Sequence, residues 1–430
     1  MAYRIIYRLC DWVGDLTGTI ILTPCTYAVG NCAEQIYYGL IRARKEKRKL
    51  VILYPYELPW RLKFGLPNME LVNIESEYRC SLNIVSHNIA RLLVTIYFGF
   101  FRAFSFPVRL LTGHHLNEYY RTPMIGALAL WKPDPWITNF SWDIVEKYEW
   151  RRQLEEPLQV SLSKRKKITA ENLRIRMGIP ADAWFACLHV REGGFHKDQC
   201  AERNANILNY IDAIKEITGR GGWVVRLGDV TMTRLPAMER VIDYPFTEYK
   251  SALMDIYLIS ECRVYIGMSS GVFDVAQLFQ RPIITTNMSS WLYPFPKKKN
   301  DIGLFKHIYS KSRNKFLSVR EWLEEPFEAV SFRTLGEDYV LHENSPQELK
   351  MAIKEYFDCD GNFGITPLQR QFNEIRLRNG KKLITESYIS EPEWDMEHRY
   401  RLASRLDSVA GVVSPDYLQK NWDRDARDAT

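Results

Sequence analysis

Between residues 184 and 288 the chain repeats one pattern, in which a short apolar run stops at small or charged residues and a helical pattern follows. Near-continuous apolar, β-branched runs of this length are typical of parallel strands that are buried on both faces. The fold class that this alternation predicts is α/β, with helices layered over a parallel sheet. We expect strands at Phe185–Val190, Trp223–Leu227, Val264–Gly267 and Pro282–Thr286, and helices at Asn206–Thr218, Ala252–Ile259 and Gly271–Phe279.

The 430 residues exceed what one compact core usually holds, so we expect two domains. The chain also opens on a strand–helix–strand pattern, with strands at Gly18–Thr23 and Leu50–Tyr54 and a helix that Asn31 would cap and that runs to about Arg44. We therefore predict two domains, each built on a Rossmann-like α/β core. The predicted boundaries are 1–165 for the first domain, 166–360 for the second, and 361–430 for helices that return to the first domain.

Charge and cysteine usage narrow the class of partner. The net charge of +6 is mildly basic, which suits anionic small molecules or a membrane surface better than nucleic acid, and we predict no nucleic-acid partner. The eight cysteines are scattered, with no CxxC pair, so we expect a reduced, cytoplasmic setting and no structural zinc.

The segment Ile84–Leu111 is the most apolar long stretch of the sequence and admits two interpretations. One is a buried helix of the first domain. The other is a helix lying in the membrane interface, aided by the basic runs at Arg42–Lys49 and Lys164–Lys167. No uncharged apolar run reaches 18 residues, so we predict no transmembrane helix, and we place the protein in the cytoplasm, with peripheral contact at the inner membrane face as the second interpretation.

Small and cationic residues follow two of the predicted strands, and both kinds bind phosphate. Ser269-Ser270-Gly271 follows a strand and opens a helix, so its backbone N–H groups and the helix dipole would face an anion. Arg191 lies on the same face of an extended segment as His189, and its guanidinium can bind phosphate through two hydrogen bonds. The strand-to-helix turn has no P-loop lysine, which argues against ATP or GTP hydrolysis.

Further polar residues would lie at the same strand ends. Arg226 interrupts an apolar strand, so it pairs with Asp229, Asp243 or Asp255, or with a ligand. Arg203 and Asn204 are expected to orient a sugar. The donor-binding residues that we predict are Arg203, Asn204, Arg226, Gly228, Asp243, Tyr244, Ser269, Ser270, Gly271 and Asn287, and the acceptor-side residues are Asn31 and Glu34.

Catalysis is predicted for His189, Arg191 and Glu192. The general base stays open among Glu192, Asp198 and Glu34. No metal-ligand set is visible, and neither a metal nor a resident cofactor is predicted. The leaving diphosphate would then be stabilised by Arg191 and the helix N-terminus.

At these residues a resemblance can be stated. The segment His189-Val190-Arg191 resembles the His-x-Arg motif of fucosyltransferases that use GDP-sugars, although Glu192-Gly193 follows where those enzymes usually have Gly-Asp or x-Asp. The region from about Phe185 to Met288 is similar to a bacterial glycosyltransferase family of surface-polysaccharide gene clusters. The shared pieces include Arg203-Asn204-Ala205-Asn206-Ile207, Val225-Arg226-Leu227-Gly228, Asp243-Tyr244 and Ser270-Gly271.

The resemblance implies a GT-B-like fold, in which two Rossmann-like domains face across a crevice, with 1–165 as the acceptor-side domain and 166–360 as the donor domain. It also implies a metal-independent transfer of sugar from a nucleotide-diphosphate donor, GDP- or UDP-linked, to a glycan or lipid-linked glycan. Two other functions stay open on the sequence. A nucleotide-sugar epimerase of the same fold would turn over the donor without an acceptor. A non-catalytic glycan- or membrane-binding assembly protein would transfer nothing.

Overall fold

The computed structural model describes residues 12, 14–22, 24, 28–56, 68–112, 156–194, 201–289, 296, 298–324, 337–385 and 411–423. The chain divides into two compact units. The first consists of Met1–Glu149, Glu156–Lys164 and Gln277–Gln280, and the second of Trp150–Glu155, Arg165–Ala276 and Arg281–Thr430. Each unit is described by itself.

The first unit begins with the strand–helix–strand pattern that the sequence predicts. Strands β1 (Thr19–Leu22) and β2 (Lys49–Ile52) pair in parallel, and helix α2 (Val29–Lys45) connects them. Helix α2 buries Ile36, Leu40 and Ile41. The prediction that Asn31 caps this helix is wrong. The helix starts two residues earlier, after an extended Ala28 that makes no side-chain cap, and Asn31 lies in its first turn.

The rest of the first unit is a short antiparallel pair and one long helix. After the 3-10 helix η1 (Met69–Asn73), strand β3 (Ile74–Glu75) pairs with β4 (Ser161–Leu162). Helix α3 covers Ile84–Thr112, close to the range predicted. Among the described residues, no helix is both long enough and apolar enough to cross a membrane.

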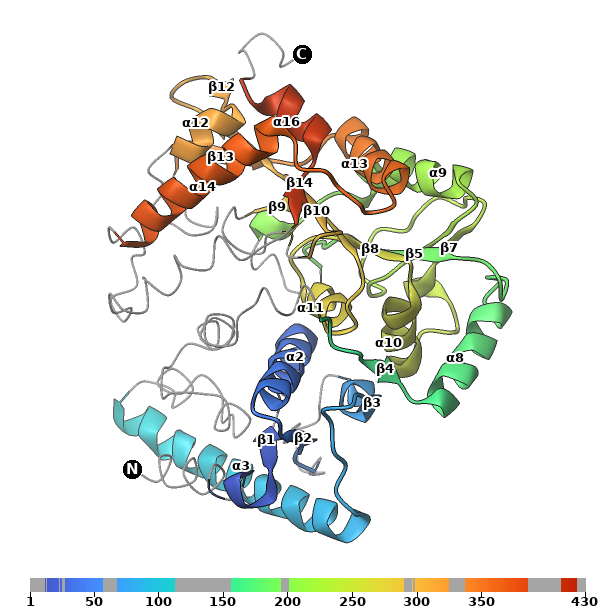
Figure 1. Ribbon diagram of the computed structural model, residues 1–430, viewed down its shortest axis with the longest axis vertical. Coiled ribbons are helices and arrows are strands. Elements are labelled where there is room, and N and C mark those ends of the chain that lie inside the picture. The colour runs from blue at the N-terminus through green and yellow to red at the C-terminus, as the bar shows by residue number, and fades with distance from the viewer. Residues whose placement is uncertain are drawn as a thin grey trace. The chain divides into compact units, whose positions relative to one another are not determined.

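The second unit is built on a parallel sheet, which in its described part has seven strands in the order β14-β10-β9-β8-β5-β6-β7 (Figure 1). With β5 counted as strand 1, the first six strands of this sheet lie in the order 3-2-1-4-5-6 when the sheet is read from its β7 edge. This is the strand order of a Rossmann fold. The predicted α/β class is confirmed. The strands are β5 (Phe185–His189), β6 (Trp223–Arg226), β7 (Val241–Asp243), β8 (Val264–Gly267), β9 (Ile283–Met288), β10 (Ile302–Phe305) and β14 (Val412–Val413).

Helices cover both faces of this sheet, with α9 and α13 on one side and α10 and α11 on the other (Figure 1). Strands β5, β8 and β9 carry buried residues at every position, as expected for strands covered twice. Asn206 caps a 3-10 helix, so the predicted helix at Asn206–Thr218 is divided in two. The elements are α8 (Lys164–Arg176), η2 (Ala201–Arg203), η3 (Ile207–Tyr210), α9 (Ile211–Gly219), η4 (Tyr244–Phe246), α10 (Ala252–Glu261), α11 (Gly271–Leu278) and α13 (Pro346–Asp358).

The C-terminal part of the chain completes the second unit. Strand β14 joins the edge of the large sheet beside β10, and α14 packs against α12 and α16. We predicted from the sequence that segment 361–430 returns to the first domain. The contacts of β14, α14 and α16 just described lie within the second unit. The elements are β11 (His307–Ser310), β12 (Lys315–Phe316) and β13 (Tyr339–His342), which form an antiparallel sheet, with α12 (Val319–Glu324), α14 (Pro367–Thr385) and α16 (Pro415–Asn421).

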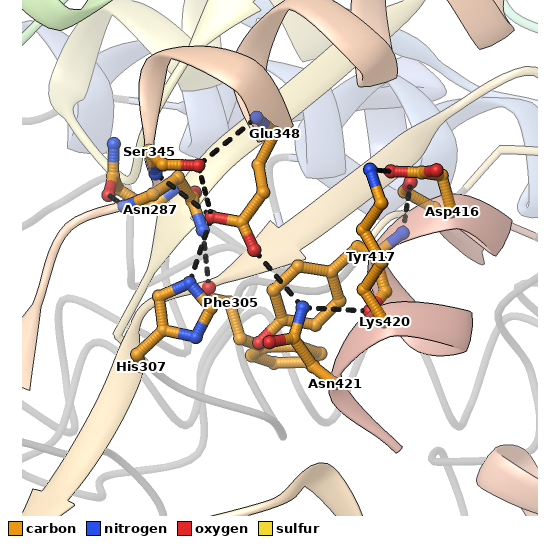
Figure 2. Close-up of polar contacts among 11 residues, drawn as sticks. Asn287, Phe305, His307, Ser345, Glu348, Asp416, Tyr417, Lys420 and Asn421 are labelled. Carbon is orange, nitrogen blue, oxygen red and sulfur yellow. Dashed lines mark hydrogen bonds and ion pairs between the residues drawn. The ribbon is translucent and has the colours of Figure 1, made fainter. Parts of the chain in front are cut away.

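A buried ion pair ties these C-terminal elements together (Figure 2). Glu348, in the first turn of α13, accepts hydrogen bonds from the backbone N–H of Ser345 at 2.9 Å and from Nδ2 of Asn421 at 3.0 Å, and pairs with Nε2 of His307 at 2.9 Å. Burial alone would raise the pKa of Glu348, but the hydrogen bond and charge of His307 bring it down to about 2. The carboxylate is therefore ionised and holds β11, α13 and α16 in one arrangement.

Candidate functional site

The carboxyl ends of β5 and β8 define the candidate site. These two strands are adjacent, and the chain order reverses between them, with β6 and β7 on one side and β9 and β10 on the other. In open α/β sheets such a switch point is where ligands bind, because the loops that follow the two strands diverge there. Two of the predicted segments lie at this point: His189–Arg191 begins at the last residue of β5, and Ser269-Ser270-Gly271 follows β8.

His189 and Ser270 form a hydrogen bond across the switch point. The Oγ of Ser270 lies 3.3 Å from Nδ1 of His189. Burial, together with the positive charge of Arg226, lowers the pKa of His189 to about 4. At neutral pH the ring is uncharged. Among the described residues Ser270 is its only hydrogen-bond partner, so Nε2 can serve a ligand as a neutral donor or acceptor.

Arg191 is held in place by Asn204 and Ala205. Its Nη1 donates to the side-chain oxygen of Asn204, and its carbonyl oxygen accepts from the N–H of Ala205 at 3.0 Å. The carbonyl oxygen of Asn204 in turn accepts from Nζ of Lys306 at 2.6 Å. Asn204 therefore lies between two cationic side chains, Arg191 after β5 and Lys306 after β10.

Lys306 was not predicted from the sequence. It directly follows β10 and is 4% exposed. Burial lowers the pKa of its ammonium group, against the opposing charges of Glu343 and Glu202. The signal available in the sequence was a lysine at the end of an apolar run, Ile302-Gly303-Leu304-Phe305, a position that in this fold points to the ligand edge.

The turn from β8 into α11 presents backbone donors at the same point. Ser269, Ser270 and Gly271 are all partly exposed, so none is sealed in the core. The first N–H groups of a helix have no partner within the helix, and the helix dipole adds partial positive charge there. This turn therefore offers an anion the N–H groups that the sequence predicted, next to His189.

Arg226 is fully buried and has partners within the unit. The β6–β7 register places it opposite Asp243, whose Oδ1 accepts from Nη1 at 3.0 Å, and Nη2 donates to the carbonyl oxygen of Thr233 at 2.9 Å. Glu192 lies 3.5 Å from Nη2 and also accepts from the N–H and Oγ1 of Thr233 at 2.8 and 2.9 Å. Arg226, Asp243 and Glu192 thus hold the loop after β6 in place through Thr233 and Leu235.

Two further predicted residues shape the backbone around this loop. Gly228 has φ +147, and a Cβ there would lie 2.3 Å from Sδ of Met232, so the turn after β6 requires glycine. Tyr244 is buried, and its hydroxyl donates to Oδ1 of Asp255 at 2.9 Å and accepts from the N–H of Ser251 at 3.1 Å. Both residues fix loops at the strand ends.

Asn287 forms part of the support beneath the site. It adopts a left-handed backbone conformation with φ 49, and its backbone N–H and side-chain oxygen exchange hydrogen bonds with Asn344 at 2.8 and 2.7 Å. Its Nδ2 donates to Tyr210, whose hydroxyl lies 2.7 Å from Oγ1 of Thr286. Asn344 precedes Ser345, so this pair connects β9 to the ion pair of Figure 2.

The remaining predicted residues lie elsewhere. Arg203 is partly exposed and pairs with Glu202 at 3.6 Å. Asn31 and Glu34 are partly exposed on α2 of the first unit. Asp198 lies outside the described residues. Within the described part of the chain, no group of three or more His, Cys, Asp or Glu side chains is placed to hold a metal ion.

Comparisons with known proteins return two distant likenesses among solved structures. One is a glycosyl transferase family 9 structure from Veillonella parvula DSM 2008, with a TM-score of 0.25, 12% identity, and coverage of 35% of this chain and 42% of that chain. The other is the E. coli ADP-heptose LPS heptosyltransferase II, with a TM-score of 0.30, 14% identity, and coverage of 62% of this chain and 83% of that chain. No family model and no curated protein matches the chain. At such scores the functional argument rests on the geometry of the site.

Proposed function

We propose that the chain is a glycosyltransferase of the GT-B type that binds a nucleotide-diphosphate sugar at the switch point of its second unit. The observation that carries the proposal is the cluster of a neutral His189, a cationic Arg191 and the Ser270 turn at the ends of β5 and β8. A diphosphate needs cations and backbone N–H groups that approach it closely, and this cluster supplies both.

The residues take distinct roles in this proposal. Arg191 and the first N–H groups of α11 stabilise the charge that develops on the leaving diphosphate. His189, which is neutral, hydrogen-bonds a sugar hydroxyl or a phosphate oxygen rather than carrying charge. Lys306 holds Asn204, and Asn204 holds Arg191. Glu192, Arg226 and Asp243 act as positioning residues, because their polar groups brace one another.

The donor is proposed to carry GDP or UDP, and the acceptor to be a glycan or lipid-linked glycan of a bacterial surface polysaccharide. The resemblance of His189-Val190-Arg191 and of the segments around it to sugar-transferring families supports this choice. We also propose that transfer needs no metal ion, so that EDTA leaves turnover unchanged.

A thermal-shift series with GDP, UDP, CMP, dTDP and ADP tests the proposal. A nucleotide at a hundred times its Kd stabilises the folded protein by about 2.7 kcal/mol. We expect one diphosphate to raise the Tm, Arg191→Ala to abolish the shift, and the control Arg240→Ala, an exposed arginine of the same unit, to retain it.

Turnover assays distinguish the alternatives. The matching nucleotide sugar should release nucleotide only when a glycan acceptor is added, and Arg191→Ala should lower kcat by about a hundredfold or more. Conversion of the donor without an acceptor would instead identify an epimerase. The absence of any nucleotide-induced shift, with stabilisation by polysaccharide, would replace the proposal with a binding protein.

A further inference from the structure

The hydroxyl of Tyr265 is a buried polar group at the switch point, and the proposed function gives it no role. Tyr265 belongs to β8 and is fully buried, and its ring packs edge-on against Phe273 of α11, one of the helices that cover this face of the sheet (Figure 1). The hydroxyl is sealed from solvent and has no hydrogen-bond partner among the described residues. A buried hydroxyl without a partner is costly, so its position calls for an explanation.

The strand register brings this hydroxyl to the end of β5. His189 lies opposite Gly267 in the pairing of β5 with β8, and Tyr265 precedes Gly267 by two residues, so His189 and Tyr265 face the same side of the sheet. Gly267 has no side chain to separate them. A Cβ there would lie 3.0 Å from the hydroxyl oxygen of Tyr265 and 2.7 Å from the carbonyl oxygen of His189. Glycine at this position therefore lets the tyrosine hydroxyl reach the strand end.

Ser270 lies beside both of these side chains. Its Oγ is 3.3 Å from Nδ1 of His189. Burial raises the pKa of Tyr265, and the neighbouring hydroxyl of Ser270 opposes that rise by hydrogen bonding. The two hydroxyls are therefore close, although their geometry is not that of a completed hydrogen bond. Ser270 thus connects Tyr265 to one nitrogen of the His189 ring.

The hydrogen bonds of this chain of three groups can run in two directions. In one, Nδ1–H of His189 donates to Ser270 and Ser270 donates to Tyr265, which leaves the buried hydrogen of the tyrosine hydroxyl without an acceptor. In the other, Tyr265 donates to Ser270 and Ser270 donates to an unprotonated Nδ1, so every hydrogen has an acceptor. The orphaned donor shifts the equilibrium against the first direction by about tenfold or more. In a neutral ring the proton then resides on Nε2.

A ring with its proton on Nε2 offers a ligand a donor and no acceptor. The other groups that the proposed function uses at the switch point donate as well, namely the guanidinium of Arg191 and the first N–H groups of α11. A ligand that satisfies all of them presents acceptors only, as the oxygens of an ionised diphosphate do. A sugar hydroxyl carries a hydrogen, for which none of these groups provides an acceptor.

We propose that Tyr265 and Ser270 are positioning residues that hold His189 in the tautomer with its proton on Nε2, and that this N–H donates a hydrogen bond to an oxygen of the nucleotide diphosphate. The identity of the ligand rests on the proposed function. The tautomer does not, because it follows from the residues of β5, of β8 and of the turn before α11.

Nuclear magnetic resonance of the full chain, isotope-labelled in its histidine rings, tests this proposal at neutral pH. The signals that disappear in His189→Gln identify the ring. We expect a protonated Nε2 and an unprotonated Nδ1 in the wild type, and a shift of the Nε2 signal when the nucleotide diphosphate that raises the Tm is added. Tyr265→Phe should change the ratio of the two tautomers about tenfold in favour of Nδ1–H, because no buried donor is then orphaned. The matched control Tyr356→Phe removes the hydroxyl of a buried tyrosine of α13 and should keep the wild-type ratio.

Titration of the same variants with the nucleotide gives a second readout. The Kd should rise only about twofold in Tyr265→Phe, because binding draws the ring back to the competent tautomer. If Tyr265→Phe does not fold, Ser270→Ala removes the hydroxyl that connects the two rings and should shift the tautomer ratio in the same direction.

The outcomes separate this proposal from the proposed function. A wild-type proton on Nδ1, or a ratio that Tyr265→Phe leaves unchanged, overturns the hydrogen-bond chain even if a nucleotide binds. A protonated Nε2 whose signal does not move when a nucleotide binds overturns the contact with the diphosphate. If no nucleotide binds while Nε2 carries the proton, the proposed function fails together with the assignment of the ligand, and the role of Tyr265 and Ser270 in setting the tautomer stands.

Discussion

Replacing Arg226 with methionine separates a positioning role from ligand binding. Arg226 is completely buried, and its guanidinium bonds to Asp243, to the carbonyl oxygen of Thr233 and, at 3.5 Å, to Glu192. Methionine retains most of the apolar volume and removes the charge. The substitution therefore leaves two carboxylates and one carbonyl group without their cation, while causing little loss of packing.

The magnitude follows from the burial of those partners. Removing one member of a buried ion pair costs about 3–5 kcal/mol, because the remaining charge has no partner. The side chains of Asp243 and Glu192 are 20% and 17% exposed, and both keep backbone hydrogen bonds, Asp243 from Leu235 and Glu192 from Thr233. Water and these donors relieve part of the penalty, so we expect the lower end, about 3 kcal/mol.

Urea unfolding followed by tryptophan fluorescence measures this loss, with Trp223 of β6 as a reporter on the same strand. Arg240→Met is the matched control: Arg240 is 41% exposed and pairs with a 90% exposed Glu239, so its loss should change stability by less than about 1 kcal/mol. Adding Asp243→Asn to Arg226→Met should recover part of the loss, because one orphaned charge is removed. Stability within about 1 kcal/mol of wild type in Arg226→Met, combined with lost nucleotide binding, would refute the reasoning and make Arg226 a ligand contact.

Three further predictions follow from contacts at the site and beneath it. Lys306→Met should raise the Kd for the nucleotide about tenfold in titration calorimetry, because Asn204 and hence Arg191 lose their support, and Lys306→Arg should restore most of the affinity. Gly228→Ala should lower stability by about 2 kcal/mol in urea unfolding, since φ +147 and the contact with Met232 both oppose a Cβ. The depressed pKa of Glu348, about 2 against an ordinary value of 4.5, should stabilise the fold by about 3 kcal/mol above pH 4.5, a contribution that is lost as the pH falls from 4.5 to 2 and is absent in Glu348→Gln.

Each of these has an outcome that contradicts it. If Lys306→Arg binds nucleotide as poorly as Lys306→Met, the lysine acts through more than its charge and its bond to Asn204. An unchanged urea midpoint in Gly228→Ala would mean that the turn relaxes at no cost. An acid-unfolding profile that is identical in Glu348→Gln and wild type would show that Glu348 does not bind its proton differently in the folded and unfolded states.

The central strands were predictable because strands buried on both faces appear in the sequence as short, uninterrupted apolar runs. The predicted run Phe185–Val190 and the observed β5 differ by one residue, and Val264–Gly267 coincides with β8. A strand covered on both faces must be apolar throughout, so its first polar or small residue marks its end. His189 and Ser269 lie at the carboxyl ends of β5 and β8, where the candidate site is. For this reason the residues that the sequence predicted at the strand ends are also close together in the structure.

Pairings between strands were not predictable to the same extent. The sequence left Asp229, Asp243 and Asp255 as partners of Arg226, and the β6–β7 register selects Asp243. The pair His307–Glu348 is separated by 41 residues, and the strands β11, β12 and β13 mix polar and aromatic residues without clean alternation. Contacts of this kind are set by tertiary packing rather than by local sequence pattern.

The pairing of β14 with β10 has a consequence for how the protein is made. Strand β10 ends at Phe305, yet the strand that covers its free edge is formed by Val412 and Val413. During synthesis the growing sheet exposes an unpaired edge for more than a hundred codons, and such edges recruit other chains. A chain that terminates early, within residues 306–411, would therefore be released with an open sheet edge, and we expect such products to aggregate or to depend on chaperones.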